Sequence, residues 1–406
     1  MSKNCDLIIS GGGIAGLTFG LLMARLGLNV HLIDPAPAER ILNPSSSGRT
    51  IALMNSSINI LKGTELHEPE KLGAPIEIMS IIDKSMADKP EQKSDFEAFD
   101  IGLDQFAFNI PNNELQKSLY ELALNQPGLN IHAETKLENF TIRNGRVYAE
   151  LENKEALVAP LIIGADGRRS KVREIAGINT IEKSYNQTAM TFVINHSKSH
   201  NNIATEFHYP SGPLALVPMR GNQSSVVWVE KSDKAEEYLK LKKQELEQIF
   251  QDKTNNLLGG ITIETGVESW PLCLIKAKEI TAAHTALIAE AAHVISPITA
   301  QGLNLSLRDI AALAETLADG IRNGLALYDE TLLKTYANRR DIDLRTRIYG
   351  VDGMMRLVSN DILPLKQLRR AGFKALDRIT PLKNFAMQHG LAPTIDQGRL
   401  AAGKAL

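Results

Sequence analysis

The residues best suited to bind a ligand stand near the start of the chain, where Gly11, Gly13 and Gly16 separate two apolar runs. A strand, a glycine turn and a helix in this order gather free backbone N–H groups at the positive end of the helix dipole, which suits a pyrophosphate. Gly11 is expected to permit the tight turn, Gly13 to admit the phosphates, and Gly16 to let the helix lie close to the strand. Asp34 ends the next apolar run, about 20 residues further on, where its carboxylate can accept hydrogen bonds from ribose hydroxyls. The spacing predicts a dinucleotide site, and the alternative is a glycine turn that binds nothing.

Composition narrows the class of protein and of partner. With 406 residues, of which 43% are hydrophobic and 23% charged, the chain is long enough for a large core and is expected to form two domains. A formal net charge of −2 gives no reason to expect a nucleic-acid partner. Two cysteines are too few for a disulfide framework or a metal-ligand cluster, which favours a reducing, cytoplasmic location without a metal site. No apolar run reaches the length of a transmembrane helix, so any membrane contact is expected to be peripheral.

The remaining elements are inferred from apolar periodicity. Residues 113–126 have helical spacing. Residues 130–149 alternate as strands do, and the turn Asn144-Gly145 separates the last two of these strands. Residues 185–275 resemble mostly short strands of an antiparallel sheet, interrupted by a charged helix near 233–250. We therefore predict an α/β protein in which a β-rich unit interrupts a nucleotide-binding fold.

Two later segments contain motifs that are expected to act together with the glycine turn. The first is Gly164–Gly167, which follows a buried-strand run, and the second is Ala289–Asp309. Together with the glycine turn they resemble the motifs of flavoprotein aromatic hydroxylases of the para-hydroxybenzoate hydroxylase type, the class A FAD-dependent aromatic monooxygenases. The segments Arg49–Leu53 and Gly212–Pro218 are most similar to the ubiquinone-biosynthesis hydroxylases. The resemblance covers nearly the whole chain.

The resemblance implies a Rossmann-like, three-layer ββα FAD-binding domain with an inserted antiparallel β-sheet substrate domain and a C-terminal helical region. The FAD-binding domain is expected to comprise residues 1–75, 107–185 and 276–335, the substrate domain residues 76–106 and 186–275, and the helical region residues 336–406. The cofactor-binding residues implied by the matching motifs are Gly11, Gly13, Ile14, Ala15, Gly16, Asp34, Arg49, Asn112, Asp166, Glu290, Pro297, Gln301, Gly302, Leu303 and Asn304.

Several of these residues have expected roles. Glu290 is expected to bind hydroxyls on the ribityl or pyrophosphate side. Gly302 and Leu303 are expected to offer N–H groups to a flavin carbonyl, at a helix start that stabilises negative charge on the reduced flavin. Asp166 is expected to position the dinucleotide, and the alternative is a cap on the following helix. Pro297 and Gly302 are placed near the flavin, but no residue is assigned as catalytic.

Three positions depart from the family pattern. Ala289-Glu290 stands where the family has Gly-Asp, and Glu290 keeps the carboxylate on one more methylene. Ala300 replaces the first glycine of Gly-Gln-Gly, and Asn112 stands where relatives often carry arginine. We interpret His293 as a structural hydrogen-bonding residue and not as a base.

The implied reaction needs little acid–base chemistry from the protein, because FAD supplies the difficult step. NAD(P)H reduces the flavin, O₂ forms a C4a-hydroperoxyflavin, and an electron-rich ring is hydroxylated, while the protein excludes water and positions the ring. The ring is expected to belong to a lipophilic substrate, a polyprenylated phenol of ubiquinone biosynthesis. Alternating strand residues suggest an apolar pocket for it, and ordinary burial in a core is the alternative. These residues are Met190, Leu216, Pro218 and Trp228.

Two other functions are compatible with the same motifs. The protein could be an FAD monooxygenase of a small soluble aromatic or secondary metabolite, or a non-catalytic scaffold subunit of a biosynthetic complex. A basic amphipathic surface in the C-terminal region could rest on the inner face of an anionic membrane or meet ubiquinone-biosynthesis subunits, and a packing helix with solvated lysines is the alternative. Its cations are Lys366, Arg369, Arg370, Lys374, Arg378 and Lys383.

Overall fold

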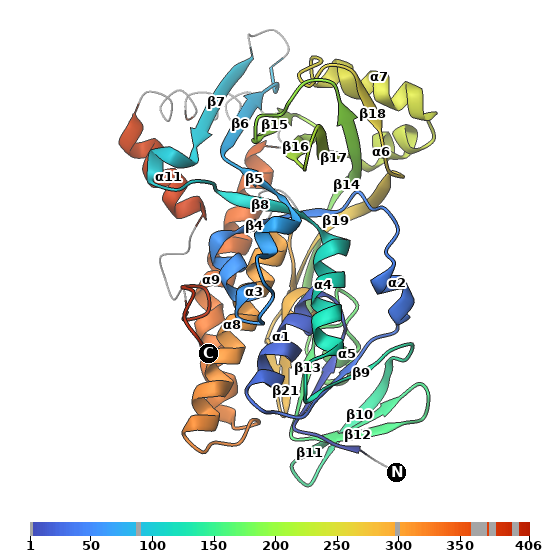
Figure 1. The fold of residues 1–406 in the computed structure, drawn as a ribbon, viewed down its shortest axis with the longest axis vertical. Helices are drawn as coiled ribbons and strands as arrows, with labels where there is room; N and C mark the ends of the chain where they lie inside the picture. The colour runs from blue at the N-terminus through green and yellow to red at the C-terminus, as the bar shows by residue number, and fades with distance from the viewer. Residues whose placement is uncertain (1–2, 87–90, 297–300, 359–371, 373–378, 392–397) are drawn as a thin grey trace.

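The computed structural model describes residues 3–86, 91–296, 301–358, 372, 379–391 and 398–406 (Figure 1). At its centre is a six-stranded sheet whose strands are parallel except for one edge strand. Both faces of this sheet are covered, which is why its central strands read as uninterrupted apolar runs. The order is β20 (Thr281–Ala282), β21 (Thr285–Leu287), β13 (Leu161–Gly164), β2 (Leu7–Ser10), β3 (Val30–Ile33) and β9 (Leu129–His132).

Helices cover one face of this sheet and a smaller sheet covers the other, so the unit has three layers (Figure 1). The helices are α1 (Ile14–Arg25), α4 (Asn112–Leu124) and α8 (Gln301–Arg322). The smaller sheet consists of β1 (Lys3–Asn4), β12 (Ala156–Ala159), β11 (Arg146–Leu151) and β10 (Leu137–Arg143). The α/β class predicted from the sequence is confirmed.

The second large sheet has nine strands and lies above the first in Figure 1. Residues 76–106 and 186–275 both contribute to it, because β6 pairs with β15 in parallel. Two of its strands extend past the predicted limits, since β14 begins at Thr180 and β19 ends at Ala277; the domain boundaries themselves stay a prediction. The order is β22 (His293–Val294), β19 (Glu268–Ala277), β14 (Thr180–His196), β17 (Gln223–Lys231), β16 (Gly212–Pro218), β15 (Ile203–Tyr209), β6 (Ile78–Asp83) and β7 (Gln92–Glu97), and β18 (Ile261–Ile263) pairs with β14 beside this path.

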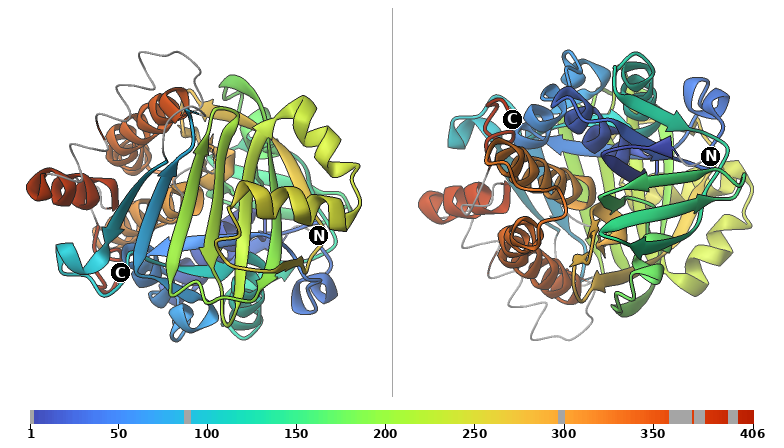
Figure 2. Two further views of the ribbon diagram at one scale, coloured as in Figure 1. Left: turned by 90° about the horizontal axis from the view of Figure 1, so that it is seen from above. Right: turned by 90° about the horizontal axis from the view of Figure 1, so that it is seen from below.

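Side-chain alternation gives the nine-stranded sheet two different faces. The outer face is closed by α6 (Ser232–Leu239) and α7 (Lys243–Lys253), which Figure 2 shows lying across the strands. On the inner face, Ser225 contacts Thr50 and Asn109 of a three-stranded sheet. That small sheet, made of β4 (Thr50–Met54), β8 (Ala107–Pro111) and β5 (Ala74–Ile76), therefore joins the two large ones.

The C-terminal part is helical where it is described. A long helix, α9 (Glu330–Val358), packs along α8, and α11 (Thr380–Leu391) lies against a single-turn helix near Asp100. Of the basic residues named above, Lys383 pairs with Asp100 at 3.3 Å, and the other five lie outside the described residues. No helix within the described ranges is long and apolar enough to cross a bilayer. The shorter helices are α2 (Ala38–Leu42), α3 (Asn55–Lys62), α5 (Lys171–Ile175), η1 (Pro69–Leu72), η2 (Ala98–Ile101) and η3 (Ala289–Ala291).

A pair of histidines at the edge of the six-stranded sheet, of which His31 is buried, predicts a pH-dependent stability. Nδ1 of His31 lies 2.9 Å from Nε2 of His132, and burial together with His132 lowers the pKa of His31 from 6.5 to about 4. The unfolded chain therefore binds a proton that the folded chain excludes. We expect the stability of the protein to fall as the pH drops from about 7 to about 5, by at most about 1.4 kcal/mol per pH unit from this group.

Urea unfolding across this pH range measures the effect. The variant His31→Gln is expected to show a flatter profile than the natural protein. An unchanged slope in that variant would contradict the assignment to His31.

Candidate cofactor and active site

The glycines of the turn after β2 have two different roles. Gly11 has φ +111°, and a Cβ there would lie 2.3 Å from the carbonyl oxygen of Ala165. A Cβ on Gly16 would lie 1.8 Å from the carbonyl oxygen of Gly11. A Cβ on Gly13 would meet no atom of the described residues within 4 Å. The turn and the close helix approach thus need Gly11 and Gly16, whereas Gly13 leaves space where phosphates can approach the start of α1.

The carboxylate predicted to bind ribose also holds the glycine turn. Oδ2 of Asp34 accepts the Gly12 N–H at 2.5 Å, and Oδ1 accepts the Ala36 N–H at 2.8 Å. Ile14 and Ala15 form the first residues of α1, whose N–H groups have no partner within the helix. The described geometry therefore gathers backbone donors beside Asp34, and the ribose contact itself stays a prediction.

Asp166 follows β13 and has one oxygen engaged and one available. Its Oδ2 accepts the N–H groups of Lys171 and Val172 at 2.8 and 3.1 Å, so it caps the start of α5. Its Oδ1 is buried and has no hydrogen-bond partner among the described residues. A buried acceptor without a donor is costly, so this oxygen fits a site that a polar ligand completes.

A buried charge network organises the second flavin motif. Asp309 of α8 accepts hydrogen bonds from the Ala289 N–H at 3.0 Å, from Nε2 of His293 at 2.6 Å and from Nε of Arg340 at 2.7 Å. Burial raises the pKa of Asp309, but its interactions with His293 and Arg340 outweigh this and hold the pKa below its ordinary value. Ala289 has φ +56°, and the bond to Asp309 holds its backbone there. The hydrogen bonding predicted for His293 is confirmed, and the interpretation that it does not act as a base stays a prediction.

Glu290 projects from η3, next to this network, and remains half-exposed. Its carboxylate lies 3.9 Å from Nε of Arg168. The neighbouring Arg173 is buried and donates to the carbonyls of Ala291 and Arg168 at 2.8 and 2.7 Å, so it anchors this corner. Glu290 is therefore accessible to a ligand, and its ribityl contact stays a prediction.

The start of α8 presents the remaining predicted flavin contacts. A Cβ on Gly302 would meet no atom of the described residues within 4 Å, so none of these residues blocks the backbone there, and Leu303 follows it. Gln301 is buried, with its Oε1 at 3.5 Å from Arg308. Pro297 lies outside the described residues.

Asn304 is tied into the protein by its side-chain amide. Its Oδ1 accepts from the Met54 N–H at 3.0 Å and from Oγ of Ser57 at 2.7 Å, and its Nδ2 donates to the Ala52 carbonyl at 2.8 Å. These bonds join α8 to β4 and α3. They give Asn304 a positioning role, and its predicted contact with the cofactor remains untested.

The segment before β4 crosses the inner face of the nine-stranded sheet. Oγ of Ser47 donates to Glu268 of β19 at 2.6 Å, and the Gly48 N–H lies 3.3 Å from the same oxygen. A Cβ on Gly48 would lie 2.6 Å from the Phe192 Cα, so the two chain segments are in direct backbone contact. Sequence reasoning missed Glu268, because nothing near it in the sequence indicates a partner 221 positions away.

This contact brings two predicted cofactor residues together. The guanidinium of Arg49 lies 4.8 Å from the centre of the Trp270 ring, and the Arg49 carbonyl accepts the Asn112 N–H at 3.1 Å. Arg49 and Asn112 therefore lie where the nucleotide-binding unit meets the substrate sheet.

Removal of the Glu268 carboxylate is expected to weaken the contact between the segment before β4 and the nine-stranded sheet. Glu268→Ala leaves the Ser47 hydroxyl and the Gly48 N–H without their acceptor, which should cost about 1–2 kcal/mol. Urea unfolding and limited proteolysis of residues 43–49 measure the effect. Glu268→Gln keeps an acceptor oxygen and is expected to retain most of the stability.

Glu279→Ala is the control, since Glu279 is exposed and follows the same strand. Equal stability and equal proteolysis of Glu268→Ala and Glu279→Ala would show that the contact of Ser47 and Gly48 with Glu268 does not stabilise the protein.

The strand residues predicted for a substrate pocket lie mainly in the core. Met190, Leu216 and Trp228 are buried on the outer face, in a cluster with Phe250 of α7 and residues of α6. Pro218 ends β16, where its carbonyl accepts the Asn109 amide at 2.9 Å. This packing favours the core alternative for the first three side chains, and their role as pocket residues stays untested. Thr191, one residue from Met190, lies on the inner face; its hydroxyl is buried and has no partner among the described residues.

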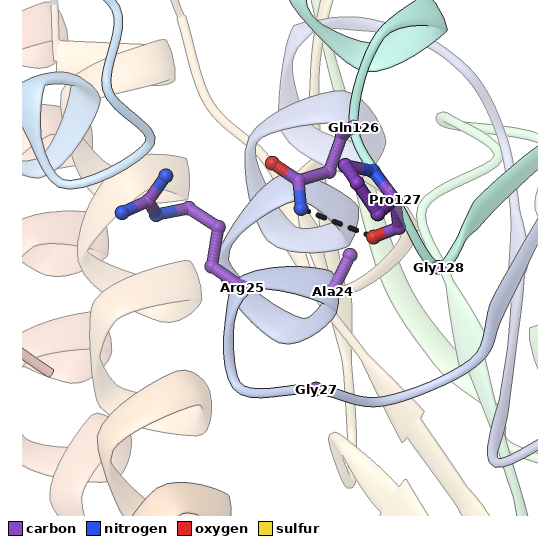
Figure 3. A pocket seen from close by; sticks show the side chains of 6 residues that line it. All are labelled: Ala24, Arg25, Gly27, Gln126, Pro127 and Gly128. Atoms are coloured by element: carbon purple, nitrogen blue, oxygen red, sulfur yellow. Dashed lines mark hydrogen bonds between the residues drawn. The ribbon is translucent and has the colours of Figure 1, made fainter.

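Two cavities lie away from these residues. One of about 380 Å³ lies at the C-terminal end of α1, between Arg25 and Pro127 (Figure 3), at the opposite end of the helix from Gly13. The other, of about 740 Å³, lies between α9 and the end of β19, beside the stacked rings of His284 and Tyr328. No predicted site residue within the described ranges lines either cavity, and the site at the glycine turn and the start of α8 stays a prediction.

Comparison with known proteins agrees with this geometry. Residues 4–343 match the family model described as FAD binding domain. The chain is 32% identical over 389 residues to the ubiquinone hydroxylase UbiL of Rhodospirillum rubrum, covering 96% of this chain and 90% of that protein. It is 26% identical to the 3-demethoxyubiquinol 3-hydroxylase of Escherichia coli, covering 95% of this chain and 98% of that protein.

Among solved structures, p-nitrophenol 4-monooxygenase PnpA from Pseudomonas putida has the same fold. The TM-score is 0.80 at 16% identity, covering 98% of this chain and 100% of that one. The chain thus combines the glycine turn, the capping aspartate, the buried Asp309 network and the inserted sheet, and its sequence matches hydroxylases over 95–96% of its length. The protein belongs to the class A FAD-dependent monooxygenases, the family that includes the ubiquinone hydroxylases.

Proposed function

We propose that this FAD-dependent monooxygenase hydroxylates the aromatic ring of a polyprenylated phenol in ubiquinone biosynthesis, with NAD(P)H as electron donor. The observation that carries the proposal is the extent of the match to UbiL, which covers 96% of the chain. A match of that extent includes the nine-stranded sheet as well as the nucleotide-binding unit. The substrate-facing half of the protein is thus similar to that of a ubiquinone hydroxylase.

When bound, FAD accepts electrons from NAD(P)H and activates O₂. The residues of this chain supply binding, orientation and exclusion of water. Gly13 and the start of α1 admit the pyrophosphate, Asp166 offers a free buried oxygen, and the open backbone at Gly302 offers N–H groups at a helix start. The backbone contact between Gly48 and β14 joins the nucleotide-binding unit to the substrate sheet. A close contact between these two units favours hydroxylation because it keeps water from the reacting centre.

In this mechanism the second flavin motif supplies no acid or base. His293 is buried and bonded to Asp309, so its Nε2 is engaged within the protein. This supports the assignment of the reaction to the bound flavin.

A lipophilic substrate also suggests where the protein works. We infer a cytoplasmic enzyme that meets the inner face of the membrane peripherally, either directly or through other ubiquinone-biosynthesis subunits. The support is chemical: a polyprenyl chain partitions into the bilayer, since each buried CH₂ contributes about 0.8 kcal/mol. Flotation of the purified protein with anionic vesicles, compared with neutral ones, tests the direct contact.

The main test is genetic and chemical. Deletion of the gene is expected to make a polyprenylated phenol lacking one ring hydroxyl accumulate in lipid extracts, as identified by mass spectrometry. Expression of the natural protein should restore ubiquinone, and expression of the Gly13→Val variant should not. Accumulation of a small water-soluble aromatic would contradict the proposed substrate and favour the alternative hydroxylase. If the purified, folded protein takes up no FAD, this would contradict the proposed enzymatic activity and favour the alternative of a non-catalytic scaffold subunit.

A further inference from the structure

We propose that Gln116 of α4 is a positioning residue for the cofactor's pyrophosphate, because it holds the Gly12 carbonyl so that the Gly13 N–H points into the binding site. The inference rests on the FAD site described above. Nε2 of Gln116 donates to the Gly12 carbonyl at 3.3 Å, while the Gly12 N–H donates to Asp34 at 2.5 Å. Gly12 is therefore held from two sides, by α4 and by the end of β3.

Gln116 belongs to a polar face of α4. Asn112, Gln116 and Tyr120 follow one another at intervals of four residues, which places them on one side of the helix. Tyr120 is buried, and its pKa is raised by burial and then by the negative charge of Asp34, so its phenol lies near that carboxylate. This face of α4 therefore lies along the glycine turn, from the segment that contacts Arg49 to the carboxylate predicted to bind ribose.

The planar peptide bond connects Gln116 to the phosphate site. In a trans peptide the carbonyl of Gly12 and the N–H of Gly13 point in opposite directions. A bond that draws the Gly12 carbonyl toward α4 thus aims the Gly13 N–H away from α4. That N–H forms no hydrogen bond within the described part of the chain, and a Cβ on Gly13 would meet nothing within 4 Å. A free donor beside open space at a helix start suits a phosphate oxygen.

The chemistry of the side chain predicts how substitutions will differ. Leucine keeps the bulk of Gln116 but cannot donate to the Gly12 carbonyl. Glutamate has the same shape, yet its carboxylate repels both that carbonyl and the phosphates. Lysine restores a donor and adds a favourable charge. A role through the pyrophosphate therefore predicts that affinity falls in the order lysine, leucine, glutamate, whereas a packing role predicts that leucine is tolerated best.

The experiment measures binding of FAD, ADP and riboflavin to the flavin-free protein by calorimetry or fluorescence, together with its urea midpoint. Gln116→Leu is expected to weaken FAD and ADP about 3- to 10-fold each, the loss of one hydrogen bond, and to leave riboflavin affinity unchanged. Gln116→Glu is expected to weaken FAD and ADP by more than about 10-fold. Gln116→Lys is expected to bind FAD about 3- to 10-fold more tightly than Gln116→Leu, because lysine restores the donor.

The matched control is Glu121→Leu, a substitution on the exposed side of the same helix, which should leave all three affinities unchanged. Unchanged ADP affinity in Gln116→Leu and Gln116→Glu would overturn the inference while leaving the proposed function intact. An equal loss for riboflavin, accompanied by a lower urea midpoint, would overturn it in favour of a packing role. A natural protein that binds neither FAD nor ADP would overturn the proposed function as well.

Discussion

Replacement of Gly13 by valine is expected to give a folded protein that retains no FAD. The fold is expected to tolerate the side chain, because Gly13 has φ −71° and a Cβ there would meet no atom in the described part of the chain within 4 Å. That same space is where the phosphates must approach the start of α1, and the valine methyl groups fill it. We expect the affinity for FAD to fall by about 100-fold or more, which corresponds to about 2.7 kcal/mol. Flavin absorbance that co-elutes with the protein, and fluorescence titration with FAD, measure the loss.

Two other glycines provide matched substitutions. Gly266 lies in a loop before β19 with open space around it, so Gly266→Val should keep both fold and flavin. Gly16→Val is expected to prevent folding, because its Cβ would lie 1.8 Å from the Gly11 carbonyl oxygen. Flavin occupancy in Gly13→Val equal to that of Gly266→Val would place the dinucleotide elsewhere.

Replacement of Asp309 by alanine is expected to cause a large loss of stability in a chain that still folds. Asp309 is fully buried and accepts from Ala289, His293 and Arg340. Asp343, at 2.7 Å, then remains as the acidic partner of the buried Arg340 guanidinium. Removing one partner of a buried ion pair typically costs about 3–5 kcal/mol. Because Ala289 and His293 lose their acceptor too, the start of α8 and η3 should loosen, and flavin should be lost with them. Urea unfolding of the flavin-free protein measures the stability term separately from cofactor binding.

Asp319 on the same helix is the control. It is half-exposed and pairs with Arg322 and Arg399, so Asp319→Ala should cost less than about 1 kcal/mol. The pKa of Asp309 in the folded protein lies below the ordinary value of 3.8. Its contribution is therefore complete above that value and is lost as the pH falls through the folded pKa. Equal urea midpoints for Asp309→Ala and Asp319→Ala would show that the buried network does not stabilise the fold.

Elements whose causes are local could be predicted from the sequence. The glycine turn is one, because the positive φ of Gly11 and the contact of Gly16 with Gly11 arise within a few residues of each other. The strand Ile203–Tyr209 is another, since alternation along a single segment sets its bounds. The resemblance of the motifs to a known family then supplied the cofactor and the class of reaction.

Only the tertiary structure decided which face of an alternating strand meets which layer. A period of two puts Met190 and Trp228 on one side of their sheet, but it does not say which neighbour covers that side. In the folded protein α6 and α7 cover it, and Thr191 lies on the opposite face, toward the nucleotide-binding unit.

The long-range polar partners were decided in the same way. Ser47 and Glu268 are 221 positions apart, and Gln116 and Gly12 are 104 apart. Each side chain taken alone reads as an ordinary polar residue in a loop, strand or helix. What each one binds depends on how the layers dock, and docking is set by the burial of whole apolar faces and not by any local pattern. The sequence by itself thus determined the cofactor's binding turn and the family, while the packing of the layers decided which residues hold that turn in place.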